Sequence, residues 1–62
     1  MSEAFREEFW KIIANIVAGE EHIEDVIGEV DERDKEDLRL ISDELRNLRQ
    51  WLIQKYRGIV FE

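Results

Sequence analysis

Apolar residues in the second half of the chain recur at steps of three and four positions. Leu38, Ile41, Leu45, Leu48 and Leu52 follow this spacing, which is typical of a helix with one apolar stripe. Polar and charged residues fill most of the positions between them. The pattern predicts a helix over about residues 35–57, followed by a glycine, Gly58, that is placed to end it.

The first half of the chain carries a matching apolar stripe, again at steps of four and three with no change of phase. Its positions are Phe5, Phe9, Ile12, Ile16, Gly19, Ile23, Val26 and Val30. This register predicts one continuous helix over about residues 3–30. A glycine costs about 1 kcal/mol in a helix interior, so the alternative is a three-helix bundle with a break near Gly19.

Between the two stripes the apolar pattern stops at a short run of charged residues. Asp31 and Asp34 are both suited to cap the start of a helix, so a turn is expected at about residues 31–34. Residues 58–62 would form an apolar tail that folds back over the open end of the hairpin, the end opposite the turn. Residues 1–62 are thus predicted to form a single helical-hairpin domain.

Two antiparallel helices joined at this turn would bring their apolar stripes into register. Ile12 would lie opposite Leu52, and Gly19 would lie opposite Leu45, which forms a layer of one small and one large residue. The predicted core comprises Phe9, Ile12, Ile16, Gly19, Ile23, Val26, Leu38, Ile41, Leu45, Leu48 and Leu52.

A hairpin of this size buries little apolar surface by itself. The chain has 62 residues and no cysteine, so no disulfide can compensate for a small core. Further apolar residues, among them Trp10, Ile13 and Trp51, flank the two stripes. A second layer of helices is needed to bury them. The predicted fold is therefore all-α, a helical hairpin that forms a homodimeric antiparallel four-helix bundle.

Charge is distributed unevenly along the predicted hairpin. Residues 20–44, at the turn end, contain twelve acidic and three basic residues, a balance of −9 within a net charge of −7. The remaining residues contain four acidic and six basic side chains, a balance of +2. This asymmetry favours a dimer with the two turns at opposite ends.

Aromatic and basic side chains gather at the open end. The candidate partner-binding residues are Trp10, Trp51, Tyr56, Arg46, Arg49, Lys55 and Arg57. Exposed tryptophans are common anchors at protein interfaces, whereas cations beside aromatic rings suit nucleic-acid backbones and bases. Capping of a tapered core by the aromatic rings is the structural alternative.

No catalytic, metal or cofactor site is expected. The sequence has one histidine, His22, within an acidic segment at residues 20–25. Gly19 occupies the place where the Glu-x-x-His motif of di-iron helical bundles needs its glutamate. The longest apolar run, residues 12–19, is interrupted by Asn15 and falls short of the roughly 20 residues of a membrane span. The sequence thus predicts a cytoplasmic protein that is not an enzyme.

Residues around the turn, Glu29-Val30-Asp31, Asp34 and Asp37-Leu38, resemble the Rop family of plasmid copy-number regulators. Members of that family are helical hairpins that dimerise into four-helix bundles and bind paired RNA hairpins. The resemblance implies a nucleic-acid regulator as the alternative function. The primary prediction is a small adaptor or oligomerisation module, whose first partner is a second copy and whose alternative partner is another protein.

Overall fold

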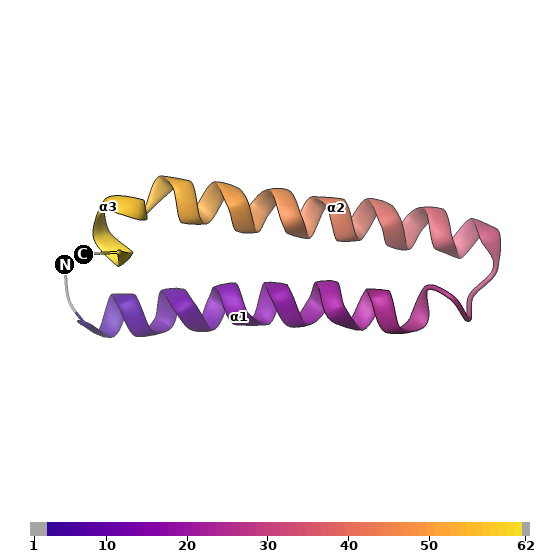
Figure 1. Ribbon diagram of the computed structural model, residues 1–62, viewed down its shortest axis with the longest axis horizontal. Helices are drawn as coiled ribbons and strands as arrows, with labels where there is room; N and C mark the ends of the chain where they lie inside the picture. Colours follow the sequence, from indigo (N-terminus) through magenta and orange to yellow (C-terminus); the bar gives the residue numbers. More distant parts are fainter. Residues whose placement is uncertain (1–2, 62) are drawn as a thin grey trace.

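Two long helices lie side by side as an antiparallel hairpin in the computed structural model, which describes residues 3–61 (Figure 1). Helix α1 is Glu3–Val26, α2 is Glu32–Lys55, and the short α3 is Arg57–Val60. Residues 3–61 include no β-strand. The molecule measures 45 × 16 × 11 Å, so its shortest dimension is about the width of one helix. The predicted all-α helical hairpin is confirmed.

Helix α1 continues through Gly19, so the three-helix alternative with a break near Gly19 is wrong. A Cβ atom on Gly19 would lie 3.4 Å from Cδ1 of Leu45, which places these two residues in one layer as expected. The apolar stripe of α1 packs along α2 on both sides of this layer. Such packing offsets the roughly 1 kcal/mol that a glycine costs within a helix.

The connection between α1 and α2 comprises residues 27–31 and begins earlier than the predicted turn at 31–34. The backbone N–H of Glu29 donates to the carbonyl of Val26 at 2.9 Å. This bond spans three residues instead of four and tightens the end of the helix. As a result, α1 ends at Val26, and the prediction that it extends to residue 30 is wrong.

Asp31 sets the start of α2. Its side chain accepts a hydrogen bond from the backbone N–H of Asp34 at 3.1 Å, and its carbonyl accepts from the Lys35 N–H at 2.9 Å. Both bonds are those of a helix N-cap, so α2 begins at Glu32 instead of residue 35. Of the two candidate caps, the earlier one is used, which lets three more residues join the helix.

The second helix also ends earlier than predicted. The backbone N–H of Tyr56 donates to the Leu52 carbonyl at 3.1 Å, and α2 ends at Lys55 instead of residue 57. Gly58 lies inside α3, and no glycine among the described residues has a positive φ. The expectation that Gly58 ends the long helix is therefore wrong. Residue 62 of the predicted tail lies outside the described residues.

The buried core lies at the open end of the hairpin, where α3 turns back toward α1 (Figure 1). Phe9, Ile13 and Val60 are 4–7% exposed and contact one another. Because Val60 belongs to α3, the end of the chain closes this part of the core. Five half-buried residues pack around it, namely Phe5, Val17, Leu52, Ile53 and Tyr56.

Candidate interaction surface

The two long sides of the hairpin differ in how well they are covered. A helix advances about 100° per residue, so Ile12, Gly19 and Val26 share one side of α1, while Ile13 and Val17 share the other. The first three, with Ile41 and Leu48 of α2, form what we call the open face. The opposite side, the covered face, consists of Ile13, Val17, Glu20, Arg49 and Ile53, with α3 lying across it at the open end.

Large apolar side chains on the open face remain exposed. Ile12 is 51% exposed, Ile41 49%, Leu48 45% and Val26 42%. All four belong to the predicted dimer core. Along the α2 edge of this face, Leu40 is 62% exposed and Trp51 is 55% exposed. A single hairpin therefore leaves its best-aligned apolar stripe facing solvent.

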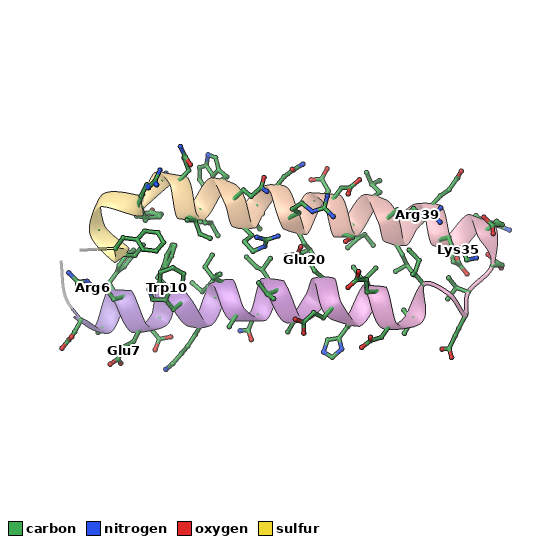
Figure 2. All side chains as sticks on the ribbon, viewed as in Figure 1. Arg6, Glu7, Trp10, Glu20, Lys35 and Arg39 are labelled. Carbon is green, nitrogen blue, oxygen red and sulfur yellow. The ribbon has the colours of Figure 1, made fainter. Side chains whose placement is uncertain are left out.

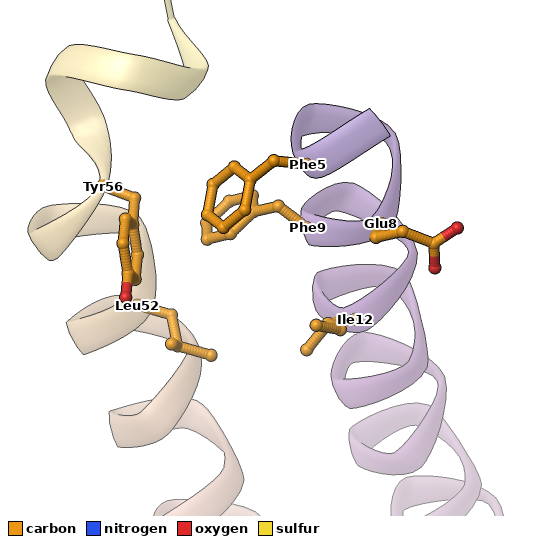
Figure 3. Close-up of a pocket in the computed structure, with 6 residues that line it drawn as sticks. All are labelled: Phe5, Glu8, Phe9, Ile12, Leu52 and Tyr56. Atoms are coloured by element: carbon orange, nitrogen blue, oxygen red, sulfur yellow. The ribbon is translucent and has the colours of Figure 1, made fainter. Parts of the chain in front are cut away.

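Two shallow grooves follow the open face. The first has a volume of about 230 Å³ and lies at the open end (Figure 3). Phe5, Phe9 and Ile12 point from α1 toward α2 there, whereas Glu8 at the rim points away. The groove is lined by Phe5, Glu8, Phe9, Ile12, Leu52 and Tyr56.

The second groove, of about 410 Å³, runs along α2 toward the turn. It is lined by Leu40, Ile41, Glu44, Leu45 and Leu48, four apolar side chains and one carboxylate. Because both grooves lie on the same side of the hairpin, they form an apolar track along its length.

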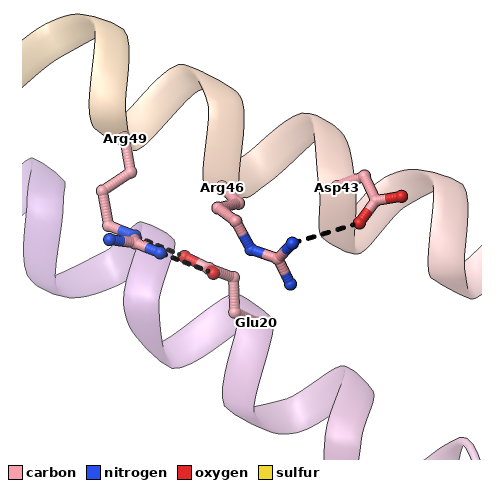
Figure 4. A network of polar contacts seen from close by, with 4 residues as sticks. All are labelled: Glu20, Asp43, Arg46 and Arg49. Carbon is pink, nitrogen blue, oxygen red and sulfur yellow. Dashed lines mark hydrogen bonds and ion pairs between the residues drawn. The ribbon is translucent and has the colours of Figure 1, made fainter.

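The covered face carries a cross-helix ion pair, and its exposed large apolar side chains, Trp10 at 37% and Phe61 at 61%, lie at the open end. The guanidinium of Arg49 donates from Nε and Nη2 to the two carboxylate oxygens of Glu20, at 2.8 and 3.0 Å (Figure 4). The side chains are 27% and 16% exposed, respectively. These hydrogen bonds hold the pKa of the Glu20 carboxyl below its usual value and raise the pKa of Arg49.

A third groove, of about 230 Å³, lies on the same side as this ion pair and nearer the turn. Its polar and charged members include Glu24, Arg39, Ser42, Asp43 and Arg46. Arg46 lies 3.6 Å from Asp43 (Figure 4). Because these side chains interact well with water, this side of the hairpin needs no apolar partner, unlike the open face.

The structure does not gather the predicted partner-binding aromatics on one surface. Trp10 packs edge-on against Phe61 at 5.4 Å between ring centroids, near the point where α3 meets α1 (Figure 2). Trp51 belongs to the edge of the open face. Tyr56 is half-buried, with its ring 5.5 Å from Phe5 and 5.7 Å from Phe9. Much of the aromatic cluster therefore packs the open end.

The predicted basic residues are likewise divided among different environments. Arg49 is bound to Glu20, and Arg46 pairs with Asp43. The Lys55 ammonium lies over the Trp51 ring, 4.8 Å from its centroid. Arg57 begins α3 and is exposed. The four cations therefore do not form one unpaired patch.

The predicted core residues fall into three groups. Phe9 is buried; Ile16, Gly19, Ile23, Leu38, Leu45 and Leu52 are half-buried; and Ile12, Val26, Ile41 and Leu48 are exposed. The sequence stripe missed Ile13 and Val60 as core members. Ile13 lies one position beside the stripe, and Val60 enters the core only because α3 folds back.

Comparison of the chain with protein-family models, curated proteins and solved structures finds no significant match. Within residues 3–61, no three Asp, Glu or His side chains are grouped so that they could hold a metal ion. None of the helices in this range is both long and apolar enough to cross a membrane. The open face is thus the most distinctive surface of the described structure.

Proposed function

We propose that the chain is a small, non-enzymatic oligomerisation and adaptor module whose working form is a homodimeric four-helix bundle. The single observation that carries this proposal is the exposure of Ile12, Val26, Ile41 and Leu48 along one side of the hairpin. Monomeric soluble proteins rarely leave so continuous an apolar stripe in water. A second layer of helices would cover it.

The size of the hairpin supports the same proposal. Only three apolar side chains are buried among the described residues, and all three lie at the open end. The turn half of the molecule has no buried residue of its own. Because chains of this length rarely reach a sufficient core alone, association through the open face would supply the missing burial.

A second copy is the occupant that the charges favour. The turn end of the hairpin carries −9 and the open end +2. Two copies with their turns at opposite ends would set each acidic half beside the less acidic half of the other. In a two-fold dimer the same surface of both copies forms the interface, so no other protein is needed for assembly.

The nucleic-acid alternative has weaker support in the arrangement of the cations. Arg49 would have to leave a two-bond interaction with Glu20 to contact a phosphate. Arg46 and Lys55 are already near Asp43 and Trp51, respectively. The chain is acidic overall, which opposes binding to a polyanion.

A pair of matched charge substitutions on α2 tests the proposal. Leu48→Glu places a carboxylate on the open face, and Gln50→Glu places one at an exposed position on another side of the same helix. Losing the burial of Leu48 in both copies costs about 3 kcal/mol, so the dimer dissociation constant should rise by about 100-fold.

The measurement is the native mass of both variants by light scattering at several concentrations. Gln50→Glu should keep the mass of the unsubstituted protein, and Leu48→Glu should shift it to that of one chain at micromolar concentration. Equal masses for the two variants would contradict the proposal, because the open face would then have no part in assembly.

A further inference from the structure

The apolar stripes that contain the open-face residues are arranged symmetrically about one layer of the hairpin. Ile12 and Val26 each lie seven residues from Gly19 on α1. Leu38 and Leu52 each lie seven residues from Leu45 on α2, and Ile41 and Leu48 lie four and three residues from it. Gly19 and Leu45 are themselves neighbours across the hairpin. Counted from this common centre, each stripe therefore has nearly the same spacing of apolar residues toward the N-terminus as toward the C-terminus.

From this symmetry we infer that two copies pack through their open faces about a two-fold axis at the Gly19–Leu45 layer, with their turns at opposite ends. The inference rests on the proposed function and specifies its geometry. The axis runs across the hairpin, so α1 lies antiparallel on α1 of the second copy and α2 on α2. Gly19 would then lie where the two copies of α1 cross, and its lack of a side chain would let them approach closely.

The α2 edge of the open face provides an independent check of this centre. Leu40 lies five residues before Leu45, and Trp51 lies six residues after it. Antiparallel pairing of the two α2 helices thus brings Leu40 opposite Trp51 of the second copy. At 62% and 55%, these are the two most exposed large apolar side chains of α2. Their contact would cover both.

Charges on the same edge agree with this pairing. Asp37 lies eight residues before Leu45, and Lys55 lies ten residues after it, so opposite charges would meet. The midpoint of this pair is displaced from Leu45 by only one residue, or about 1.5 Å along the helix. Each dimer would contain two such pairs at its opposite ends.

The α1 edge shows a similar match. Lys11 and Asp25 lie eight residues before and six residues after Gly19, so opposite charges again meet across the axis. Lys11 is 67% exposed and 3.2 Å from Glu8 in the single hairpin, which leaves it accessible to a second carboxylate. The same centre therefore accounts for apolar and charged positions on both helices.

A parallel dimer lacks these matches. With both turns at one end, α1 would face α2 of the second copy and two turn regions of charge −9 would lie together. Leu40 would then face the level of Glu24 in α1, where the nearest exposed large apolar side chain is Val26, two positions further along the helix. The crowding of like charges at the turn end disfavours this arrangement.

Single-cysteine variants distinguish the two arrangements, because the natural chain has no cysteine. Asp37→Cys and Lys55→Cys are made in separate chains, mixed, refolded together and oxidised. The expected product is a disulfide-linked heterodimer. In a parallel dimer these positions would be about 27 Å apart along the axis, far beyond the roughly 7 Å limit between Cα atoms of a disulfide.

The matched control combines Glu8→Cys chains with the same Lys55→Cys chains. Glu8 and Lys55 lie near the same level of the hairpin, so this mixture should form a disulfide only in a parallel dimer. The inference is overturned if the control mixture cross-links as well as or better than the first mixture, or if neither cross-links although the native mass is that of a dimer. In those cases the proposed function survives, whereas a native mass of one chain would overturn both.

Discussion

Glu20 and Arg49 show how a single pair of side chains gives the two sides of the hairpin different chemistry. Their two hydrogen bonds connect α1 to α2 on the covered face, where the side chains are only partly exposed. A two-bond interaction between a carboxylate and a guanidinium is stronger than a typical surface ion pair and constrains the relative rotation of the helices. It therefore favours the orientation that leaves Ile12 and Leu48 on the opposite side.

Removing the charge of Glu20 should reveal a pH-dependent contribution to stability. Because Arg49 lowers the pKa of this carboxyl in the folded state, its stabilising effect is fully present above the ordinary value of 4.5. The effect is lost as the pH falls through the lower folded pKa. Glu20→Gln should therefore reduce the free energy of unfolding by about 1 kcal/mol at pH 7 and have little effect in strong acid.

Urea unfolding at pH 7 and pH 2.5, at one protein concentration, measures this difference. Glu21→Gln serves as the control, since it removes the same charge from an exposed neighbouring position. If Glu20→Gln reduces the free energy of unfolding equally at both pH values, the ionised carboxylate is not the stabilising species.

At the scale of helices, the sequence predicts which helices exist and whether they are continuous better than it predicts where they begin and end. The unbroken phase from Phe9 to Val26 correctly indicates that α1 continues through Gly19, because the packing of many residues outweighs one unfavourable glycine. The turn was misplaced by a few residues because Asp31 and Asp34 can both cap a helix. Which of them does so depends on the backbone geometry of residues 27–31, and that geometry has no periodic signal in the sequence.

The N-cap of α2 should contribute measurably to stability. Asp31→Ala removes the acceptor of the Asp34 N–H at 3.1 Å and should lower the free energy of unfolding by about 1 kcal/mol. Asp31→Asn keeps a capping oxygen and should lose much less. Thermal unfolding followed by circular dichroism compares the two variants; equal losses would mean that negative charge, and not the cap, is what matters at this position.

At the scale of the molecule, the shortest dimension of 11 Å is decisive. A layer one helix thick has two sides, and α3 with the Glu20–Arg49 pair covers only one of them. The sequence predicted the apolar stripes that form the other side. It did not predict which side α3 would cover, because a short tail has no helical period and its direction follows from where Val60 packs on Phe9 and Ile13.

The candidate surface was predictable to a similar extent. Exposed Ile12, Val26, Ile41 and Leu48 all belong to stripes visible in the sequence, since their spacing alone places them in line. The division of Trp10 and Trp51 between different sides was not anticipated. Both lie near the open end, but they point in different directions around their helix axes. The pairing of Arg49 with Glu20 was missed for the same reason: it depends on the rotation of the two helices about their axes.

The native mass of the unsubstituted chain in solution tests the central claim most directly. Light scattering or sedimentation equilibrium across the micromolar range should give twice the chain mass of 7.5 kDa, because in the proposed dimer a second copy covers the open face. A folded, helical species with the mass of a single chain throughout that range would contradict the account.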